Sequence, residues 1–325
     1  MSLAANEITI AVTVYSRREF LKQSIESALG QTVPVRVMVV EDCGPDAGLE
    51  AYVRQEFGSR VDYFRSPRRR GIFGNWNTCI ERCPTRWLSI LHDDDYLQPE
   101  FVATMLELNH QAGDRGLYFG RTIVTDTAGH PRPEWNKPPL PAPWMLVTLP
   151  EVLFVSPFSF PGQLFQVAFA QALGGFRETS LWTGEWELWA KIIAHHGGAQ
   201  TDSTVAVFRD HTGWDRGTSR MYRSGKQHAL TAVQCKRNLA LARRLQVPSM
   251  SLEEWKRSRP AIPLRYLLYY AKYFTPLYLV YNTRRLQRGR APNWRYAFYQ
   301  AVTRLGGPPL VRLASRLWTR LRHPQ

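Results

Sequence analysis

The chain has 325 residues, of which 44% are hydrophobic and 21% are charged. This composition excludes disordered and collagen-like proteins and leaves ample length for a packed interior. The net charge of +15 is uneven: Glu254 is the last acidic residue, residues 256–322 hold fifteen Lys and Arg, and residues 1–254 hold 27 of each sign. A block of one sign points to an anionic partner, either nucleic acid or a lipid surface.

The four cysteines do not make a disulfide framework in a chain of this length. Cys79 and Cys83 have no second Cys or His pair at metal-site spacing, so we expect reduced and mostly packed thiols. The first residues lack the basic and long apolar segments of a secretory signal. No apolar run reaches the ~20 residues needed to span a bilayer. We therefore expect a cytoplasmic protein that contacts a membrane only from the side.

Strand and helix patterns alternate from the start of the chain. Ile8–Val14 and Val35–Val40 are apolar, β-branched runs that predict buried strands, and the apolar residues of Arg17–Leu29 between them recur at helical spacing. Strand, helix and strand in this order predict a βαβ unit, and hence an α/β fold with a mostly parallel sheet flanked by helices. The next predicted elements are a strand at Val61–Arg65, a helix at Asn75–Arg82 and a strand at Arg86–Leu91.

Carboxylates follow two of the predicted strands. The triplet Asp93–Asp95 comes after the last strand, and Glu41–Asp42 closes the second. Parallel strands bring their carboxyl ends to one edge of a sheet, where ligands of open α/β sheets bind. A divalent cation there would offset the repulsion and bridge to a diphosphate, while a carboxylate at the second strand would accept hydrogen bonds from a base or ribose. The alternatives are a solvated acidic loop and an ordinary turn aspartate.

The later segments predict a long loop, a turn and a helix. Gly129–Pro150 is rich in Pro and Trp, which predicts a loop without a regular element, near the acceptor side. Gly174–Phe176 predicts a turn, and the pattern is helical from Trp186 to Ala194. Four aromatic residues around the loop either stack on a ligand or simply pack beneath it: Trp135, Trp144, Phe158 and Phe160.

The order of five motifs resembles the family 2 glycosyltransferases of the GT-A fold. The motifs are VTVYSRREFLKQSIESALGQT, VVEDCGPD, RRRGIFGNWNTCIE, LHDDDYLQPEF, and GGFRE followed by GEWELWAKI, and the resemblance covers residues 7–215. It implies an enzyme that transfers a sugar from a nucleotide-sugar to an acceptor hydroxyl with inversion at the anomeric carbon, using Mg²⁺ or Mn²⁺. Uridine is expected from the habits of the family.

Carried over by position, the resemblance makes Asp94 the metal ligand of the family's Asp-x-Asp motif, with Asp95 and His211 as further metal candidates. Asp95 instead caps the following turn in an alternative interpretation, and a lone His such as His211 is often structural. At the first motif position, where many relatives have Asp, this chain has His92. The resemblance assigns contacts with the nucleotide-sugar to Tyr15, Arg17, Asp42, Gly71, Asn75, Asp93 and Arg209.

Inversion requires a base on the sugar face opposite the leaving diphosphate. The family has an Asp in a motif similar to Glu-Asp-x-x-Leu-Trp, and the resemblance gives this role to Glu185. Two departures are the longer Glu side chain and Gly184 in place of the acidic neighbour. Glu187 is the second candidate for the base, although we expect it to be a carboxylate on the helix surface. In the same way Arg68–Arg70 is expected to be a solvated basic loop.

The basic tail predicts two short amphipathic helices, at 294–305 and 310–321, each with an apolar stripe containing Trp and a basic face. Ile262–Tyr281 is dense in Tyr and Leu but is interrupted by basic residues and Pro276. These features are typical of segments that lie in the interface of an anionic membrane. The alternative is a helical subdomain that packs on the core. Nucleic-acid binding is not expected, because no recognition motif accompanies the charge.

The sequence therefore predicts a GT-A nucleotide-sugar-binding and catalytic domain at residues 1–220 and a helical, membrane-associating region at 221–325. We expect a glycosyltransferase that is peripheral on the inner face of the cell membrane and acts on a lipid-linked or membrane-associated glycan. The alternatives are a transferase acting on a soluble or protein acceptor, with a tail that serves homo-oligomerisation, and a nucleotide-sugar-binding protein without catalysis.

Overall fold

A computed structural model describes residues 3–133, 139–153, 156, 158–180, 183–211 and 226–247, with backbone only at 226–232 and 236. The chain divides into two compact units, residues 1–214 with 234–255, and residues 215–233 with 256–325. The fold below is that of the first unit. The domain boundary predicted after residue 220 stays a prediction, and the predicted tail segments lie outside the described residues.

The described elements alternate between strands and helices. The strands are β1 Ile8–Val14, β2 Arg36–Glu41, β3 Asp62–Arg65, β4 Trp87–His92, β5 Tyr96–Leu97, β6 Leu117–Thr125, β7 Trp144–Val147, β8 Gln163–Gln166 and β9 Gly198–Arg209. The α-helices are α1 Leu21–Leu29, α2 Leu49–Phe57, α3 Gly71–Arg82, α4 Phe101–Ala112, α5 Val167–Ala172, α6 Gly184–His196 and α8 Lys226–Arg244. Short 3₁₀ turns lie at Ala5–Glu7, Gly58–Arg60 and Leu149–Val152.

The strands of the described residues form one sheet in the order β3-β2-β1-β4-β8-β6-β9-β5, with β7 also paired to β9. β1 is parallel to β2 and β4, β2 to β3, and β6 to β9, whereas β8 runs antiparallel between β4 and β6. The reversal on either side of β8 makes β4 and β6 point the same way. The segments that follow β1, β2, β4 and β9 therefore meet at one edge of the sheet.

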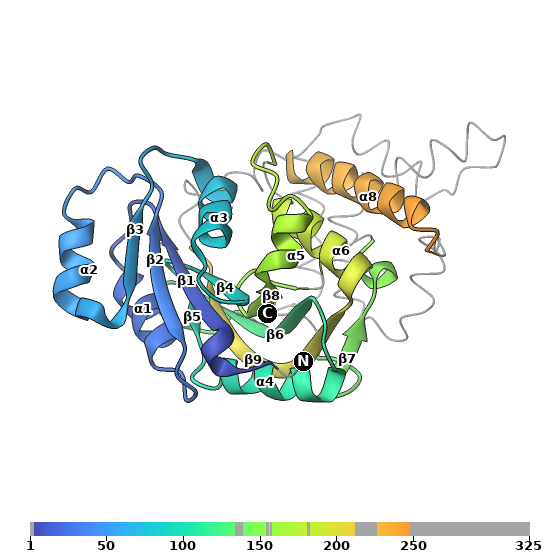
Figure 1. The fold of residues 1–325 in the computed structure, drawn as a ribbon, viewed down its shortest axis with the longest axis horizontal. Helices are drawn as coiled ribbons and strands as arrows, with labels where there is room; N and C mark the ends of the chain where they lie inside the picture. Colours follow the sequence, from blue (N-terminus) through green and yellow to red (C-terminus); the bar gives the residue numbers. More distant parts are fainter. Residues whose placement is uncertain are drawn as a thin grey trace, which may run out of the picture. The chain divides into compact units, whose positions relative to one another are not determined.

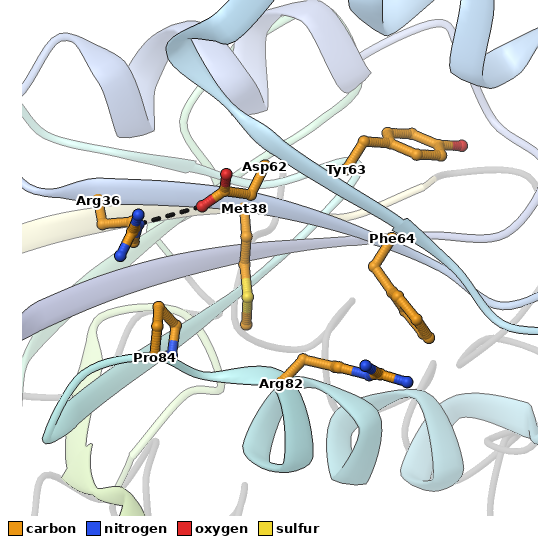
Figure 2. A pocket seen from close by; sticks show the side chains of 7 residues that line it. All are labelled: Arg36, Met38, Asp62, Tyr63, Phe64, Arg82 and Pro84. Atoms are coloured by element: carbon orange, nitrogen blue, oxygen red, sulfur yellow. Dashed lines mark ion pairs between the residues drawn. The ribbon is translucent and has the colours of Figure 1, made fainter.

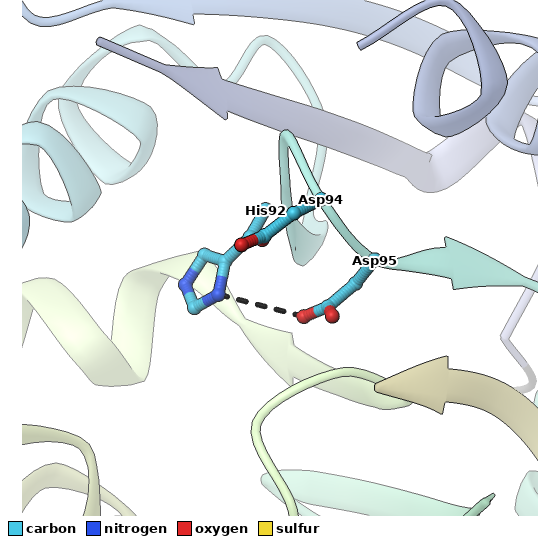
Figure 3. A group of neighbouring side chains, drawn as sticks. All are labelled: His92, Asp94 and Asp95. Carbon is cyan, nitrogen blue, oxygen red and sulfur yellow. Dashed lines mark ion pairs between the residues drawn. The ribbon is translucent and has the colours of Figure 1, made fainter. Parts of the chain in front are cut away.

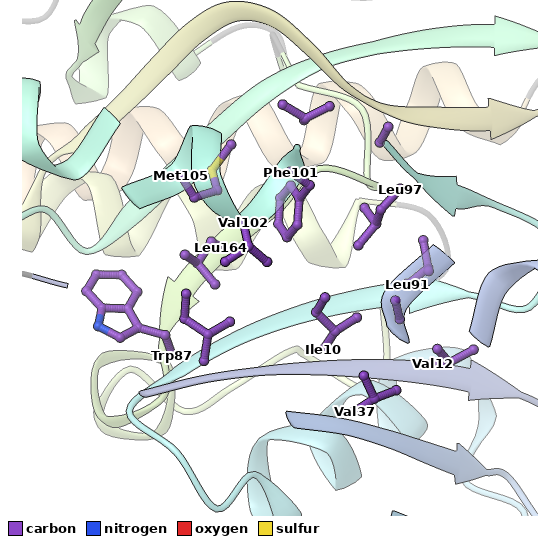
Figure 4. Packing of buried hydrophobic residues seen from close by; sticks show 14 of the residues in the cluster. Ile10, Val12, Val37, Trp87, Leu91, Leu97, Phe101, Val102, Met105 and Leu164 are labelled. Atoms are coloured by element: carbon purple, nitrogen blue, oxygen red, sulfur yellow. The ribbon is translucent and has the colours of Figure 1, made fainter. Parts of the chain in front are cut away.

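Helices cover both faces of this sheet (Figure 1). α1, α2 and α4 contribute to one hydrophobic cluster with the sheet, and α3, α5 and α6 lie on the opposite face. All seven residues of β1 are buried, as expected for a central parallel strand covered on both sides. Figure 4 shows Ile10 and Val12 of β1 in the same cluster as Leu91 of β4 and Phe101 of α4. This rigid centre holds the strand ends that carry the polar residues.

The α/β class and the elements predicted along the first half of the chain are confirmed, with ends that shift by up to four residues. The helix expected at Arg17–Leu29 begins at Leu21, and the one expected at Asn75–Arg82 begins at Gly71. The prediction that Gly129–Pro150 contains no regular element is wrong, because Trp144–Val147 is β7 and pairs with β9. No proline lies between Pro143 and Pro150, so the backbone donors of Trp144–Val147 are available for pairing.

No helix in the described part of the chain is long and apolar enough to cross a membrane.

Glu187 of α6 is a buried carboxylate that joins three segments. It accepts hydrogen bonds from Arg177 at 2.6 and 2.9 Å and from Arg237 of α8 at 3.0 Å, and it pairs with Lys191 at 3.2 Å. Only 6% of its side chain is exposed, so the prediction that Glu187 lies on the helix surface is wrong. Burial by itself would raise the pKa of Glu187, but Arg177 and Lys191 lower the pKa below its usual value.

We predict that Glu187→Gln lowers the free energy of unfolding at pH 7 by about 2 kcal/mol, because it leaves three cations with a neutral partner. A carboxyl whose folded pKa is depressed stabilises the fold above its unfolded pKa and loses that effect as the pH falls. The difference between the wild type and the variant should therefore be constant above about pH 5 and shrink below about pH 4.5. Urea unfolding of both proteins across this range measures it.

The matched control is Glu50→Gln, which removes the exposed pair of Glu50 with Arg54, whose side chains are 42% and 61% exposed. This control should cost less than about 0.5 kcal/mol. Equal stability of the wild type and Glu187→Gln at pH 7 would contradict the structural role of Glu187.

Candidate active site

Three buried carboxylates follow β4 at the edge where the parallel strands end. Asp93, Asp94 and Asp95 are 5%, 8% and 0% exposed. Arg17, in the segment after β1, donates to Asp93 at 2.9 Å and pairs with Asp94 at 2.5 Å. His211, after β9, contacts the same Asp94 oxygen through Nε2 at 2.8 Å. The triplet is therefore a buried site, and the solvated-loop alternative is wrong.

The two carboxylates that Arg17 bridges differ in their affinity for a proton. Burial raises the pKa of Asp93 to about 6, although Arg17 opposes the shift. Burial acts in the same direction on Asp94, but the hydrogen bond with His211 and the charge of Arg17 outweigh it and lower the pKa of Asp94 to about 2. Asp94 is thus the member of the pair that binds a proton less readily, which suits a metal ligand.

Asp95 points toward His92 (Figure 3). Its Oδ1 accepts a hydrogen bond from the backbone N–H of Arg209 at 2.8 Å. Its Oδ2 is fully buried, lies 3.5 Å from His92 Nδ1, and has no hydrogen-bond partner among the described residues. One potential ligand atom each from His92, Asp94 and Asp95 lies within 4.8 Å of the others. Oxygen and imidazole donors at this separation fit a divalent cation such as Mn²⁺ or Mg²⁺.

The carboxylates at the end of β2 organise the next loop. Asp42 accepts hydrogen bonds from the backbone N–H groups of Arg70 at 2.7 Å and Gly71 at 2.8 Å. It therefore caps the start of α3, which is more than an ordinary turn aspartate does. Glu41 is fully buried and accepts hydrogen bonds from the Gly44 N–H at 2.8 Å, from Arg65 at 2.5 Å and from the Tyr63 hydroxyl. Since its partners saturate it, Glu41 holds the turn that presents Asp42.

Tyr15, Gly71 and Asn75 lie around the same edge. A Cβ on Gly44 would lie 1.7 Å from the carbonyl oxygen of Tyr15, so only glycine lets the turns after β1 and β2 approach this closely. The guanidinium of Arg69 lies 4.3 Å from the centre of the Tyr15 ring. Gly71 has φ +77°, with open space in the direction of a side chain. Asn75 donates to the carbonyl of Val40 at 3.2 Å, and its buried Oδ1 has no partner among the described residues.

Arg209 supports the acidic triplet from the protein side. Its guanidinium donates to the carbonyl oxygen of Asp94 and to Gln23 Oε1, both at 2.6 Å, and lies 3.9 Å from the centre of the Phe20 ring. The side chain is buried. These contacts fix the backbone of the triplet and do not bring the guanidinium onto the Asp94 carboxylate. A contact between Arg209 and a donor stays a prediction.

The helix that carries Glu185 touches the site through a row of aromatic rings. A Cβ on Gly184 would lie 2.4 Å from the Phe73 ring, which explains why no acidic side chain occupies that position. The Phe73 ring lies edge-on to Trp76 at 5.0 Å, and Trp76 stacks on His92 at 5.4 Å. Glu185 is half-buried in the first turn of α6, directly after this contact.

The sequence did not indicate that His92 and its aromatic neighbours belong to the site. Phe160 stacks on His92 at 4.4 Å and on Trp76 at 4.1 Å, so it packs beside the acidic cluster. Phe158 is buried and stacks on Phe119, which favours the packing alternative for it. Trp144 is a partly buried residue of β7 packed against the core, and Trp135 lies outside the described residues. The signal for His92 was its place at the first motif position.

A separate hollow opens beside the edge strand β3 (Figure 2). It is lined by Arg36, Met38, Asp62, Tyr63, Phe64, Arg82 and Pro84. Arg36 pairs there with Asp62 at 3.1 Å, and the Arg82 guanidinium lies 4.1 Å from the centre of the Phe64 ring. None of the predicted site residues lines this hollow, so it is distinct from the acidic cluster.

Solved structures with a similar fold include two glycosyltransferases. TarS 1–349 of S. aureus in complex with UDP-GlcNAc has a TM-score of 0.52 and 15% identity, over 87% of this chain and 92% of that one. The mannosyltransferase PcManGT from Pyrobaculum calidifontis in complex with GDP-Man and Mn²⁺ has a TM-score of 0.56 and 15% identity, over 98% of this chain and 81% of that one. The fold is therefore that of the GT-A glycosyltransferases.

Sequence comparison gives two informative relatives. The succinoglycan biosynthesis protein ExoO of Rhizobium meliloti (strain 1021) is 35% identical over 108 residues, which are 33% of this chain and 31% of that protein. An uncharacterized glycosyltransferase of Rickettsia felis is 23% identical over 195 residues, 57% of this chain and 31% of its own. The chain thus spans about a third of the length of these relatives. Residues 9–163 match the model of glycosyl transferase family 2, and this segment of the chain is assigned to that family.

Proposed function

We propose that this chain is a metal-dependent, inverting glycosyltransferase that moves a sugar from a nucleoside diphosphate sugar to a hydroxyl of a lipid-linked or membrane-associated glycan. The observation that carries the proposal is the buried cluster Asp93–Asp95 at the carboxyl edge of the sheet of a family 2 domain. The complexes of TarS with UDP-GlcNAc and of PcManGT with GDP-Man and Mn²⁺ support a nucleotide-sugar donor and a divalent ion.

Asp94 and Asp95 are the residues that we propose to hold the ion, and His211, which contacts Asp94 Oδ2 through Nε2, orients that carboxylate. The buried Asp95 Oδ2, which has no hydrogen-bond partner among the described residues, is the atom for which an ion compensates best. When bound, Mn²⁺ or Mg²⁺ stabilises the negative charge that develops on the leaving diphosphate. Arg17, whose side chain is 39% exposed, is the cation that the chain itself places beside Asp93 and Asp94, and we assign it a phosphate contact.

The nucleoside is proposed to lie across the ends of β1 and β2. Tyr15 and Asp42 follow those strands, and Gly71 and Asn75 form the adjoining wall at the start of α3. The open space above Gly71 supports donor contacts there, as does Asn75 Oδ1, which has no hydrogen-bond partner among the described residues. Uridine is the proposed nucleoside, on the habits of the family, although the two similar structures hold different nucleosides.

Glu185 is the proposed base. It takes the proton of the acceptor hydroxyl while that oxygen attacks the anomeric carbon. The bond from this carbon to the diphosphate oxygen breaks, and the nucleoside diphosphate leaves with the electron pair. Attack from the face opposite the diphosphate inverts the anomeric configuration. Glu187 is not proposed, because its carboxylate is held by Arg177, Arg237 and Lys191.

We predict that a donor stabilises the chain only when metal is present, because the ion joins the diphosphate to the triplet. A UDP- or GDP-sugar added together with Mn²⁺ should raise the melting temperature of the wild type. The same nucleotide-sugar added without Mn²⁺ should not raise it. Asp94→Asn should abolish this rise. The control Asp46→Asn changes an Asp that also pairs with an Arg, Arg18, and should keep it. A full donor response of Asp94→Asn in the presence of chelator would contradict the metal site.

Glu185→Gln is expected to lower kcat by about 10²- to 10⁴-fold, since it removes the proton acceptor but not the donor site. The same variant should keep its Mn²⁺-dependent donor response, which separates an enzyme from a binding protein. Glu187→Gln, assayed where it is folded, should keep turnover. If Glu185→Gln kept its turnover and folded Glu187→Gln lost it, the role of the base would belong to Glu187 and not to Glu185.

The acceptor is proposed from the tail and from the similarity to a succinoglycan biosynthesis protein. Fifteen basic residues between 256 and 322 would each contribute roughly 1 kcal/mol near an anionic lipid surface. Attachment from the inner face of the membrane would concentrate the enzyme with a lipid-linked acceptor in two dimensions.

Flotation with vesicles tests this part. The whole chain should float with vesicles containing anionic lipid and not with neutral ones, and a chain ending near Pro260 should float with neither. Retention of the donor response in the shortened chain verifies that it is folded. Equal flotation of both chains would remove the membrane proposal and leave a soluble or protein acceptor.

A further inference from the structure

His92 occupies the position at which the motif departs from its family pattern, and its ring faces the acidic cluster. Figure 3 shows the imidazole directed at the Asp95 carboxylate, with Asp94 beside it. His92 is the last residue of β4, so its backbone belongs to the rigid sheet and not to the loop that follows. A side chain on a strand end is held more precisely than one on a loop.

The separation between His92 Nδ1 and Asp95 Oδ2 is 3.5 Å. That is long for a hydrogen bond between two such groups. Two ligands that each lie about 2.1 Å from one ion are about 3.0 Å apart in octahedral and about 3.4 Å apart in tetrahedral geometry. The observed separation is longer than that of a good hydrogen bond and is close to that of two ligands of one ion in tetrahedral geometry.

A second observation points to a ligand at the same place. Asp95 is 0% exposed, and its Oδ2 has no hydrogen-bond partner among the described residues. A buried carboxylate oxygen without a hydrogen bond, with an imidazole nitrogen 3.5 Å away as its ion-pair contact, is costly, and a cation removes that cost. Asp94 Oδ2 is held by Arg17 and His211, so its other oxygen is the one available to an ion between Asp94, Asp95 and His92.

The His92 ring is fixed by stacking. Phe160 lies parallel to it at 4.4 Å with 6° between the planes, and Trp76 lies on it at 5.4 Å with 13°. Its Nε2 is buried and has no hydrogen-bond partner among the described residues. The aromatic rings thus fix the orientation in which Nδ1 faces Asp95, and they pre-organise this nitrogen as a metal ligand.

We propose that His92 is a direct ligand of the divalent ion, together with Asp94 and Asp95, and that this nitrogen makes the site prefer Mn²⁺ over Mg²⁺. The proposal rests on the proposed function, which calls for the ion. Mg²⁺ strongly prefers oxygen ligands, whereas imidazole nitrogen suits first-row transition metals. A chain with Asp at this position would offer oxygen atoms alone and lose this preference.

Electron paramagnetic resonance of Mn²⁺ bound to the full chain tests the proposal without turnover. The wild type, with Mn²⁺ and a nucleoside diphosphate, should show hyperfine coupling to a directly bonded nitrogen. His92→Gln should lose that coupling and bind Mn²⁺ at least about tenfold more weakly. His92→Asp should bind Mn²⁺ without the coupling and bind Mg²⁺ more tightly than the wild type does. His110→Gln, at the end of α4, is the matched control and should change nothing.

The outcomes separate the two proposals. Nitrogen coupling that persists in both His92 variants and disappears in His211→Gln would overturn the role of His92 and assign the ligand to His211. Mn²⁺ binding without any nitrogen coupling in the wild type would overturn the role of His92 and leave the proposed function standing. No Mn²⁺ binding by the wild type, with or without the nucleotide, would overturn both. The His92→Asp variant keeps the test decisive if His92→Gln does not fold.

Discussion

Three consecutive carboxylates buried at the end of one strand constrain this fold more than any other feature. Asp93 and Asp94 are paired with Arg17 and His211, and the backbone of the triplet is held by Arg209. Arg17 comes from the segment after β1, and Arg209 and His211 come from the end of β9 and the residues just after it. The carboxylates can remain buried only because the topology brings those strand ends together with the end of β4.

Whether the oxygens of a buried carboxylate have hydrogen-bond partners distinguishes the carboxylates that support the fold from the one that we propose to bind an ion. Glu41 and Glu187 have their oxygens filled by hydrogen bonds from Arg, Tyr, Lys or backbone groups, and they hold turns and helices in place. Asp95 keeps one buried oxygen without a partner among the described residues, beside His92 and Asp94. Glu41 and Glu187, whose oxygens are fully hydrogen-bonded, stabilise the fold. Asp95, which lacks one hydrogen bond, marks the place that we propose for the ion.

Much of the fold and of the site edge followed from local sequence patterns. The β-branched runs that became β1, β2 and β4, and the helical spacing of α1, depend only on neighbours in sequence, and the parallel arrangement then placed Asp42 and Asp93–Asp95 at one edge. β7 was missed because its pairing partner, β9, lies more than fifty residues later in the chain.

The partners of the polar residues were much harder to predict. Glu187 looked like a surface carboxylate because Arg177 and Arg237, which bury it, come from separate segments. The contacts of the Arg209 guanidinium with Asp94 and Gln23 were not predicted, because they depend on the pairing of β9 with β5, which joins distant parts of the chain. His92 was noted as a departure from a motif, yet its ring is positioned by Trp76 and Phe160, which pattern analysis cannot place beside it.

The most direct test of the account is a crystal structure of the chain with Mn²⁺ and an unreactive nucleoside diphosphate sugar, with the ion located by its anomalous scattering. The account predicts the ion between Asp94 and Asp95, bonded to the diphosphate, with Arg17 moved toward a phosphate oxygen. A diphosphate bound far from Asp94, or a donor held at this edge with no ion on the triplet, would contradict it.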